Sequence, residues 1–160
     1  MPPAQQALRK ALGRFTTGVT IVTCLDVDGA PVGLTANSFG SLSLDPPLVQ
    51  WSLRLASINL AAFSRAPCFV VNVLAENQVE LSRRFASQHA DKFAEGSWSW
   101  GAGQAPVLAG AAAFFECTNF AQHEVGDHRL FVGQVLKAGE SALSPLVFNG
   151  GRYHLLGEIL

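Results

Sequence analysis

The polar stretch on which the fold depends reads Gly33-Leu34-Thr35-Ala36-Asn37-Ser38-Phe39, and it continues as Ser41-Leu42-Ser43-Leu44-Asp45-Pro46-Pro47-Leu48-Val49. Its small residues bring together hydroxyls, an amide and backbone N–H groups, whereas the runs on either side are apolar and strand-like. Before it, the Val-, Ile- and Thr-rich residues 18–25 predict a buried strand, and Asp28-Gly29 predicts a hairpin turn. We interpret residues 33–39 as a polar binding segment between strands, with an ordinary polar turn as the alternative.

Working outward, the rest of the chain reads as short strands joined by turns. Strands are expected at residues 31–36, 38–43, 47–54, 67–74, 111–124, 129–137, 145–149 and 152–156. Helices are expected at residues 4–14, at 58–65 with Ser57 as its cap, and at 77–86 behind a capping-box spacing of Asn77 and Glu80. Residues 87–110 are the least regular part. This pattern predicts one domain over residues 1–160, mainly β, built as an antiparallel barrel or sandwich with peripheral helices.

A doubly wound parallel sheet is disfavoured. Strands and helices do not alternate regularly, and no Gly-x-Gly-x-x-Gly follows the first strand.

Composition limits the function classes. The 160-residue chain is 49% hydrophobic but only 14% charged, whereas about a quarter of residues are charged in a typical domain. Low charge favours a large subunit interface, with a compact β-rich monomer carrying a Ser/Thr/Gln surface as the alternative. The net charge of −1 gives no electrostatic case for binding nucleic acid or an anionic membrane. No apolar run approaches the roughly 20 residues of a membrane span.

The termini and the cysteines bear on localisation. Residues 1–6 have no basic region ahead of an apolar core, so we expect no secretory signal. Cys24, Cys68 and Cys117 are odd in number, widely spaced and set among apolar neighbours. They are expected to be buried thiols, which predicts a cytoplasmic protein.

The sequence shows no clear motif for nucleophilic catalysis or for metal binding. The chain has no Gly-x-Ser-x-Gly motif and no cysteine in a basic, polar setting. His123, Asp127 and His128, with Glu116 or Glu124, could be imagined as a metal site. On a strand, however, residues 123 and 128 would point to opposite faces, and nothing in the spacing resembles a zinc or iron site. We therefore expect no metal.

Two further motifs connect the polar stretch to a known family. Gly18-Val19-Thr20-Ile21-Val22-Thr23 precedes it, and Gly126-Asp127-His128 lies far downstream. In this order the motifs resemble the flavin reductase-like, FMN-binding split-barrel family, over about residues 14–156. The resemblance implies a split β-barrel of Greek-key character with a few peripheral helices. It also implies a homodimer whose flavin site lies at or near the subunit interface.

The resemblance further implies an activity. Members of the family transfer a hydride from NADH or NADPH to FMN or FAD, and the reduced flavin can then serve a separate flavin-dependent monooxygenase. Such chemistry requires neither a nucleophile nor a metal, because the cofactors carry it and the protein supplies geometry. The alternative is a non-catalytic flavin-binding or electron-carrier protein on the same barrel.

The resemblance places the polar segments against the flavin. Thr35-Ala36-Asn37-Ser38 would lie along its ring and phosphate. Ser57, at an expected helix start, is a candidate phosphate ligand, and Asn59 stands where the family commonly has Thr. The alternative for Ser57 is a plain helix cap.

Three residues of the central segment would border the flavin and its phosphate: Phe85, Lys92 and Phe93. The motif ending in His128 would bind the reduced nicotinamide, with Asp127 at the turn fixing its geometry; a turn Asp with a structural His is the alternative. Tyr153, the only Tyr of the chain, would lie close to the same pocket, although core packing explains it equally well.

Overall fold

The computed structural model describes residues 1–160 and is built mainly from strands. The strands are β1 (Thr17–Gly18), β2 (Thr20–Leu25), β3 (Pro31–Ala36), β4 (Gly40–Leu44), β5 (Pro47–Arg54), β6 (Cys68–Val73), β7 (Trp98–Trp100), β8 (Pro106–Leu108), β9 (Ala113–Val125), β10 (His128–Glu140), β11 (Val147–Asn149) and β12 (Arg152–His154). The helices are α1 (Pro3–Leu12), α2 (Leu60–Arg65) and α3 (Val79–Ala86), with 3₁₀ turns η1 (Glu76–Gln78), η2 (Lys92–Ala94) and η3 (Ala102–Gln104).

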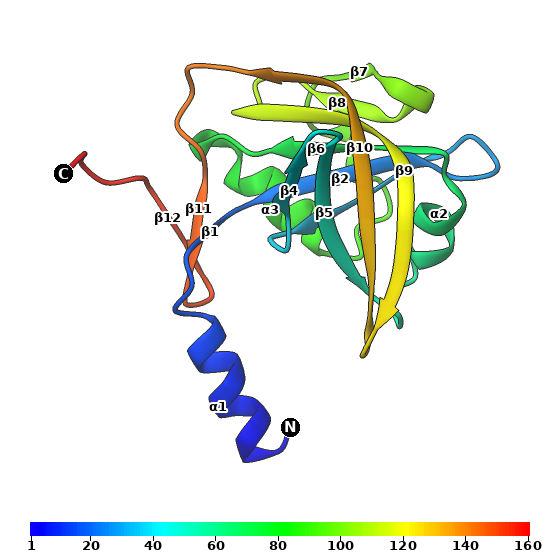
Figure 1. The fold of residues 1–160 in the computed structure, drawn as a ribbon. Coiled ribbons are helices and arrows are strands. Elements are labelled where there is room, and N and C mark those ends of the chain that lie inside the picture. The colour runs from blue at the N-terminus through cyan, green and yellow to red at the C-terminus, as the bar shows by residue number, and fades with distance from the viewer.

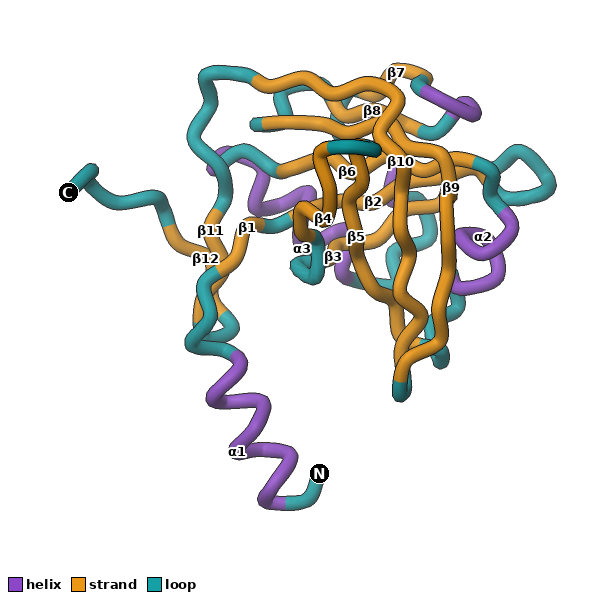
Figure 2. Tube along the Cα trace, in the orientation of Figure 1, coloured by secondary structure: helices purple, strands orange, loops and turns teal.

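Seven strands form one curved antiparallel sheet in the order β3-β2-β6-β9-β10-β5-β4 (Figures 1 and 2). Its two edges, β3 and β4, follow one another in the chain but do not pair, so the barrel stays open. The predicted split β-barrel is therefore confirmed. The opening leaves β3 free to line a groove.

The barrel encloses an aromatic core. Trp51 of β5 stacks on Phe131 of β10 with ring centroids 4.6 Å apart, and the edges of Phe63 and Phe69 meet Trp51. All four side chains are fully buried, and burying each stabilises the fold by roughly 1.5–3 kcal/mol. A second cluster, around Phe85, joins α3 to the outer side of β2 and β3. This cluster fixes α3 beside the groove.

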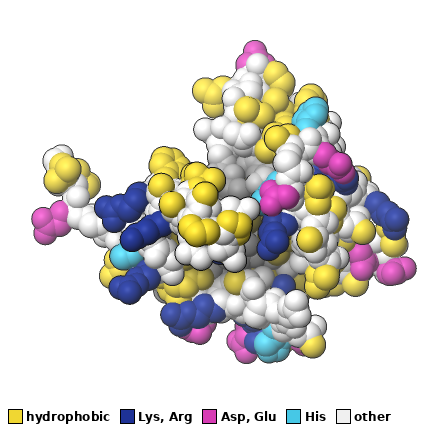
Figure 3. All heavy atoms as spheres, turned by 90° about the horizontal axis from the view of Figure 1, so that it is seen from below, with side chains coloured by type: hydrophobic (Ala, Val, Ile, Leu, Met, Phe, Trp, Pro, Cys, Tyr) yellow, Lys and Arg dark blue, Asp and Glu magenta, His cyan; other side chains and the backbone are white.

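A separate part of the chain projects from the barrel. Strands β1, β11 and β12 form a small sheet, and α1 extends from it away from the body (Figure 1). No residue of α1 is buried, and Phe15 just after it is 79% exposed. The face seen from below also exposes hydrophobic side chains between its charged groups (Figure 3). None of the helices has the length and apolar character needed to cross a bilayer.

Several local expectations are corrected. Helix α2 begins at Leu60 with Asn59 as its N-cap residue, so the prediction that Ser57 caps it is wrong. The Asn77–Glu80 capping box is also wrong, because Gln78 Oε1 instead accepts the Ala75 N–H at 2.9 Å and the turn η1 precedes α3.

The supposedly irregular residues 87–110 contain the β7–β8 hairpin. Tertiary contacts hold it in place. The Trp98 ring packs against those of Phe85 and Phe93, and the Ala102 N–H donates to Glu116 Oε2 at 2.8 Å.

Candidate active site

A groove follows the free edge of β3. Its inner compartment, of about 180 Å³, lies beside residues 35–37; its middle compartment, of about 580 Å³, lies beside residues 34–35; and its outer compartment, of about 390 Å³, lies beside residues 31–33. Neighbouring compartments share lining residues, so we treat them as one hollow, the β3 groove. Residues 54–59, before α2, and residues 85–93, from the end of α3 onward, line it as well.

Most of the residues singled out from the sequence meet in this groove. Nine of the twelve line it: Thr35, Ala36, Asn37, Ser57, Asn59, Phe85, Lys92, Phe93 and Tyr153. Ser38 does not, because the chain leaves β3 at Ala36, and the Ser38 hydroxyl instead bonds both the N–H and the C=O of Ser52. Asp127 and His128 lie outside the lining, but His128 pairs in register with Arg54, which lines the middle compartment.

Lys92 is the best-fixed cation of the groove. Its ammonium donates to the carbonyl of Phe85 at 3.1 Å and to that of Gly33 at 3.3 Å. An ammonium has three N–H donors, so one remains for a ligand. Partial burial lowers the pKa of Lys92, because desolvation disfavours its charged form. An anion beside it would restore the lost stabilisation of that charge.

Close packing explains two features around Lys92. A Cβ on Gly33 would lie 2.7 Å from the Phe85 ring, so only glycine lets β3 approach α3 this closely. Arg84 Nε donates to the carbonyls of Asp91 and Lys92 at 3.1 and 3.0 Å. These bonds hold the segment that carries Lys92 against the end of α3.

Ser57 and Asn59 add neutral donors to the middle compartment. Ser57 Oγ accepts the Asn59 N–H at 3.2 Å, which leaves its own O–H free to donate. Helix α2 is only six residues long, so the side chains rather than a helix dipole supply the donors here. Together with the exposed Arg54 and with Lys92, they form a donor set suited to a phosphate.

The small sheet lines the inner compartment with Phe148 and Tyr153. The Tyr153 hydroxyl lies 2.7 Å from Ser82 Oγ, and Thr35 Oγ1 donates to the Ser82 carbonyl at 2.7 Å. The Thr35 hydroxyl is therefore engaged by α3. Phe148, which sequence reasoning missed, packs edge-on against Tyr153 at 5.5 Å and lines the same compartment.

The β9–β10 hairpin brings His128 to the rim. Asp127 Oδ1 lies 2.7 Å from His128 Nδ1, and this hydrogen bond lowers the pKa of the Asp127 carboxyl. A bond from the Leu55 N–H to the Asp127 carbonyl at 2.9 Å joins the hairpin tip to the chain just after β5.

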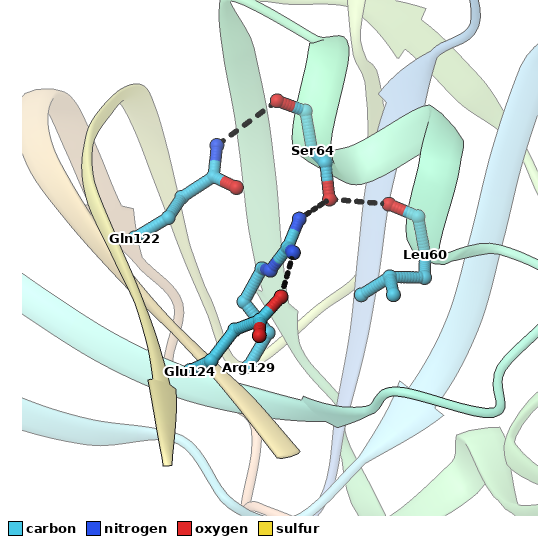
Figure 4. A network of polar contacts seen from close by, with 5 residues as sticks. All are labelled: Leu60, Ser64, Gln122, Glu124 and Arg129. Carbon is cyan, nitrogen blue, oxygen red and sulfur yellow. Dashed lines mark hydrogen bonds and ion pairs between the residues drawn. The ribbon is translucent and has the colours of Figure 1, made fainter. Parts of the chain in front are cut away.

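Polar contacts tie the same hairpin to α2 (Figure 4). Arg129 Nη1 donates to Ser64 Oγ at 2.6 Å, and that hydroxyl donates to the Leu60 carbonyl at 2.6 Å. Gln122 Nε2 donates to the Ser64 carbonyl at 3.0 Å, and Arg129 also pairs with Glu124. The hairpin and the helix that follows Ser57 are thus held as one unit.

The cysteines are unsuited to nucleophilic catalysis. Burial raises the pKa values of the Cys24 and Cys117 thiols to about 12, so neither is a thiolate at neutral pH. Cys68 is half-buried, and its pKa is raised as well. The site instead provides a groove and hydrogen-bond donors held in fixed positions, which suit ligand binding.

Residues 12–157 match the flavin reductase-like domain family. The chain belongs to this family. The resemblance stated from the sequence is confirmed.

Similar proteins are named as flavin reductases. The chain is 45% identical to the FMN reductase (NADH) SmoA of Agrobacterium fabrum, over 92% of this chain and 84% of that protein. It is 42% identical to the reductase subunit HsaB of a flavin-dependent monooxygenase from Rhodococcus jostii, over 91% and 74%. Two further curated relatives are matched over only about half of their own length, 48% and 47%.

A solved flavin reductase shares the whole architecture. The NADH:FAD oxidoreductase SgcE6 of Streptomyces globisporus, in complex with NAD and FAD fragments, superposes with a TM-score of 0.91 at 37% identity. The match covers 98% of this chain and 96% of that one. The predicted enzyme class, an oxidoreductase acting on flavin and nicotinamide, is confirmed.

Proposed function

We propose that this flavin reductase binds FMN or FAD in the β3 groove and reduces it with NADH or NADPH. The observation that carries the proposal is the convergence of Lys92, Ser57 and Arg54 in the middle compartment, next to the polar edge of β3. A bound flavin accepts a hydride from the nicotinamide. The protein binds and orients both partners and excludes water from between them.

We assign the flavin ring to the inner and middle compartments. Thr35-Ala36-Asn37 runs along this part of the groove, beside the place assigned to the polar edge of the ring. Tyr153 lies at the far end. The phosphate is assigned to the Ser57 hydroxyl, the remaining N–H of Lys92 and the side-chain amide of Asn59, three residues that line the middle compartment. Ser38 is left out of this assignment because Ser52 engages its hydroxyl.

We assign His128 to the nicotinamide. Its position opposite Arg54 puts it at the rim of the middle compartment rather than inside it. Asp127 holds Nδ1, so the ring orientation is fixed and Nε2 is available. Hydride transfer itself requires no proton from the protein, so His128 acts by binding and orienting.

We propose that the reduced flavin serves a separate flavin-dependent monooxygenase in the cytoplasm. Support comes from HsaB, which is named as the reductase subunit of such an enzyme. The protonated cysteines suit a reducing compartment.

A homodimer is part of the proposal. α1 buries nothing in its own chain, although Leu8 and Leu12 lie on one side of it. The small sheet that carries α1 also contributes Phe148 and Tyr153 to the inner compartment, so a partner seated on it would lie next to the site. Sedimentation at micromolar concentration should give a mass near twice 17.0 kDa. A fully active monomer would contradict this placement.

Steady-state oxidation of NADH or NADPH with added free flavin tests the activity. A reductase turns over many equivalents of free FMN or FAD. A flavin carrier on the same barrel would bind flavin but would show no sustained turnover, and that result would refute the proposal.

A further inference from the structure

Two hydroxyls bond each other at the edge of the inner compartment. Tyr153 Oη of β12 lies 2.7 Å from Ser82 Oγ of α3, and this is the only hydrogen bond that either hydroxyl makes within the chain. From the positions of the two oxygen atoms alone, either hydroxyl could be the donor. Their surroundings therefore decide the direction of the bond.

Burial makes Ser82 the donor. Ser82 is fully buried, whereas Tyr153 is half-buried and lines the inner compartment. Each hydroxyl has one hydrogen to donate. If Tyr153 donated, the Ser82 hydrogen would be left inside the protein without an acceptor, which destabilises a fold. If Ser82 donates, its hydrogen is satisfied and the Tyr153 hydrogen remains for the compartment.

The other parts of this pair are held in place. The Tyr153 ring packs edge-on against Phe148 at 5.5 Å between centroids, and the guanidinium carbon of Arg83 lies over it, 5.7 Å from its centroid. On the other side, Thr35 Oγ1 donates to the Ser82 carbonyl at 2.7 Å and so fixes this turn of α3 against β3. With the ring and both oxygens fixed, the rotation of the phenolic O–H is the freedom that remains, and Ser82 sets it.

We infer that Ser82 is a positioning residue, which donates to Tyr153 Oη and thereby directs the Tyr153 O–H into the β3 groove. There the phenol donates to a carbonyl oxygen or ring nitrogen of the flavin. The Thr35 hydroxyl has already given its hydrogen to Ser82, so Tyr153 and Asn37 supply the side-chain donors of the inner compartment. This inference rests on the proposed function, because it assigns a hydrogen bond to the flavin ring in the same site.

Tyr153→Phe, Ser82→Ala and the double variant test the inference, by titration of riboflavin and of FMN without nicotinamide. Tyr153→Phe should weaken the binding of both flavins by the same factor, roughly fivefold, as expected for one neutral hydrogen bond. Ser82→Ala keeps the phenol but frees its rotation, so the loss should be smaller and again equal for the two flavins. In the Tyr153→Phe background, Ser82→Ala should cause no further loss, because Ser82 acts only through Tyr153.

Thermal melting tests the direction of the bond. Tyr153→Phe strands the buried Ser82 hydrogen, so its Tm should fall. The double variant removes that hydroxyl and should therefore melt higher than Tyr153→Phe, although its flavin affinity stays low. Ser41→Ala, an exposed change on β4 outside the groove, is the matched control and should alter neither Tm nor affinity.

Three results would overturn the inference. The first is native flavin affinity in Tyr153→Phe or in the double variant, including the case in which only the KM for NADH rises, because the phenol would then serve the nicotinamide. The second is an equal loss of affinity from Ser82→Ala in both backgrounds. The third is a double variant that melts no higher than Tyr153→Phe. Failure of the native protein to bind either flavin would instead refute the proposed function.

Discussion

The guanidinium of Arg129 donates a hydrogen bond of 2.6 Å to the hydroxyl of Ser64 and so joins the strand that begins at His128 to the helix that follows Ser57. Ser64→Ala should cost about 1–2 kcal/mol of stability, since it leaves a charged donor of the half-buried Arg129 unpaired. It should also raise the KM for NADH, because the hairpin tip loses its anchor. Glu124→Gln is the control. Glu124 is an exposed partner, worth at most about 1 kcal/mol. If Ser64→Ala and Glu124→Gln have the same melting temperature and the same KM for NADH, the Arg129–Ser64 hydrogen bond does not anchor the hairpin.

Gly33→Ala tests the close approach of β3 to α3. The new methyl would meet Phe85 at 2.7 Å and Phe93 at 3.1 Å. We expect a loss of about 1–3 kcal/mol by overpacking, with weaker flavin binding because the groove wall moves. Gly18→Ala, where no atom lies within 4 Å, should be nearly neutral. Phe93→Leu in the Gly33→Ala background should recover part of the loss. The test is to compare the melting temperatures of the native protein, the two single glycine variants and the double variant. A Gly33→Ala variant as stable as the native protein would refute the packing argument.

Lys92→Met should weaken FMN binding far more than riboflavin binding. Loss of a charge-assisted hydrogen bond to phosphate costs roughly 1.5–3 kcal/mol, and riboflavin has no phosphate to lose. Lys137→Met, which changes an exposed lysine on β10, should alter neither affinity. Equal losses for the two flavins in Lys92→Met would exclude a phosphate role.

The affinity advantage of FMN over riboflavin should depend on pH. Burial lowers the pKa of Lys92 in the free protein, and a bound phosphate raises it again. Between the second pKa of the FMN phosphate, about 6, and the lowered pKa of Lys92, both charges are present and the advantage is constant. As the pH rises from that pKa toward the higher pKa of the complex, the free protein loses its charge and the advantage falls, beginning below the ordinary lysine pKa of about 10.4. Lys92→Arg should keep the advantage over this range, because a guanidinium stays charged.

His128→Ala should separate flavin binding from nicotinamide use. His128 pairs across the strands with Arg54 but does not itself line the groove, so flavin affinity should be nearly unchanged. The value of kcat/KM for the reduced nicotinamide should fall by roughly tenfold or more, about 1.4 kcal/mol of transition-state stabilisation. A variant that melts earlier but keeps native kinetics would show His128 to be structural.

The sequence was most informative where local pattern determines structure. The bounds of β3 and β5 were predicted as they are found, because both strands are rich in apolar residues and Pro31 and Pro47 stand at their starts. The β7–β8 hairpin was missed because contacts from far along the chain hold its three-residue strands. Trp98 rests on Phe85 and Phe93, and these contacts leave no periodic trace in residues 98–108.

In the candidate site, too, local motifs could be predicted from the sequence, whereas residues brought in by distant contacts could not. The predicted site residues fall in five segments of the chain, and the fold brings four of them into one groove and His128 to its rim. Gln88 and Phe148 carry no local signature and emerge only from their position in the fold. Ser38 belongs to the motif by sequence. Because β3 ends two residues earlier, its hydroxyl is used to bond Ser52.

The central claim is that flavin is bound and reduced in the β3 groove. Ala86, exposed at the end of α3, lines both the inner and the middle compartment, so Ala86→Trp fills the place assigned to the flavin ring. The most direct measurement is steady-state NADH oxidation with riboflavin, FMN and FAD in turn, by the native protein and by Ala86→Trp at matched thermal stability. We predict sustained turnover by the native protein and loss of turnover with all three flavins in the variant. Undiminished turnover in Ala86→Trp, or none in the native protein, would contradict the account.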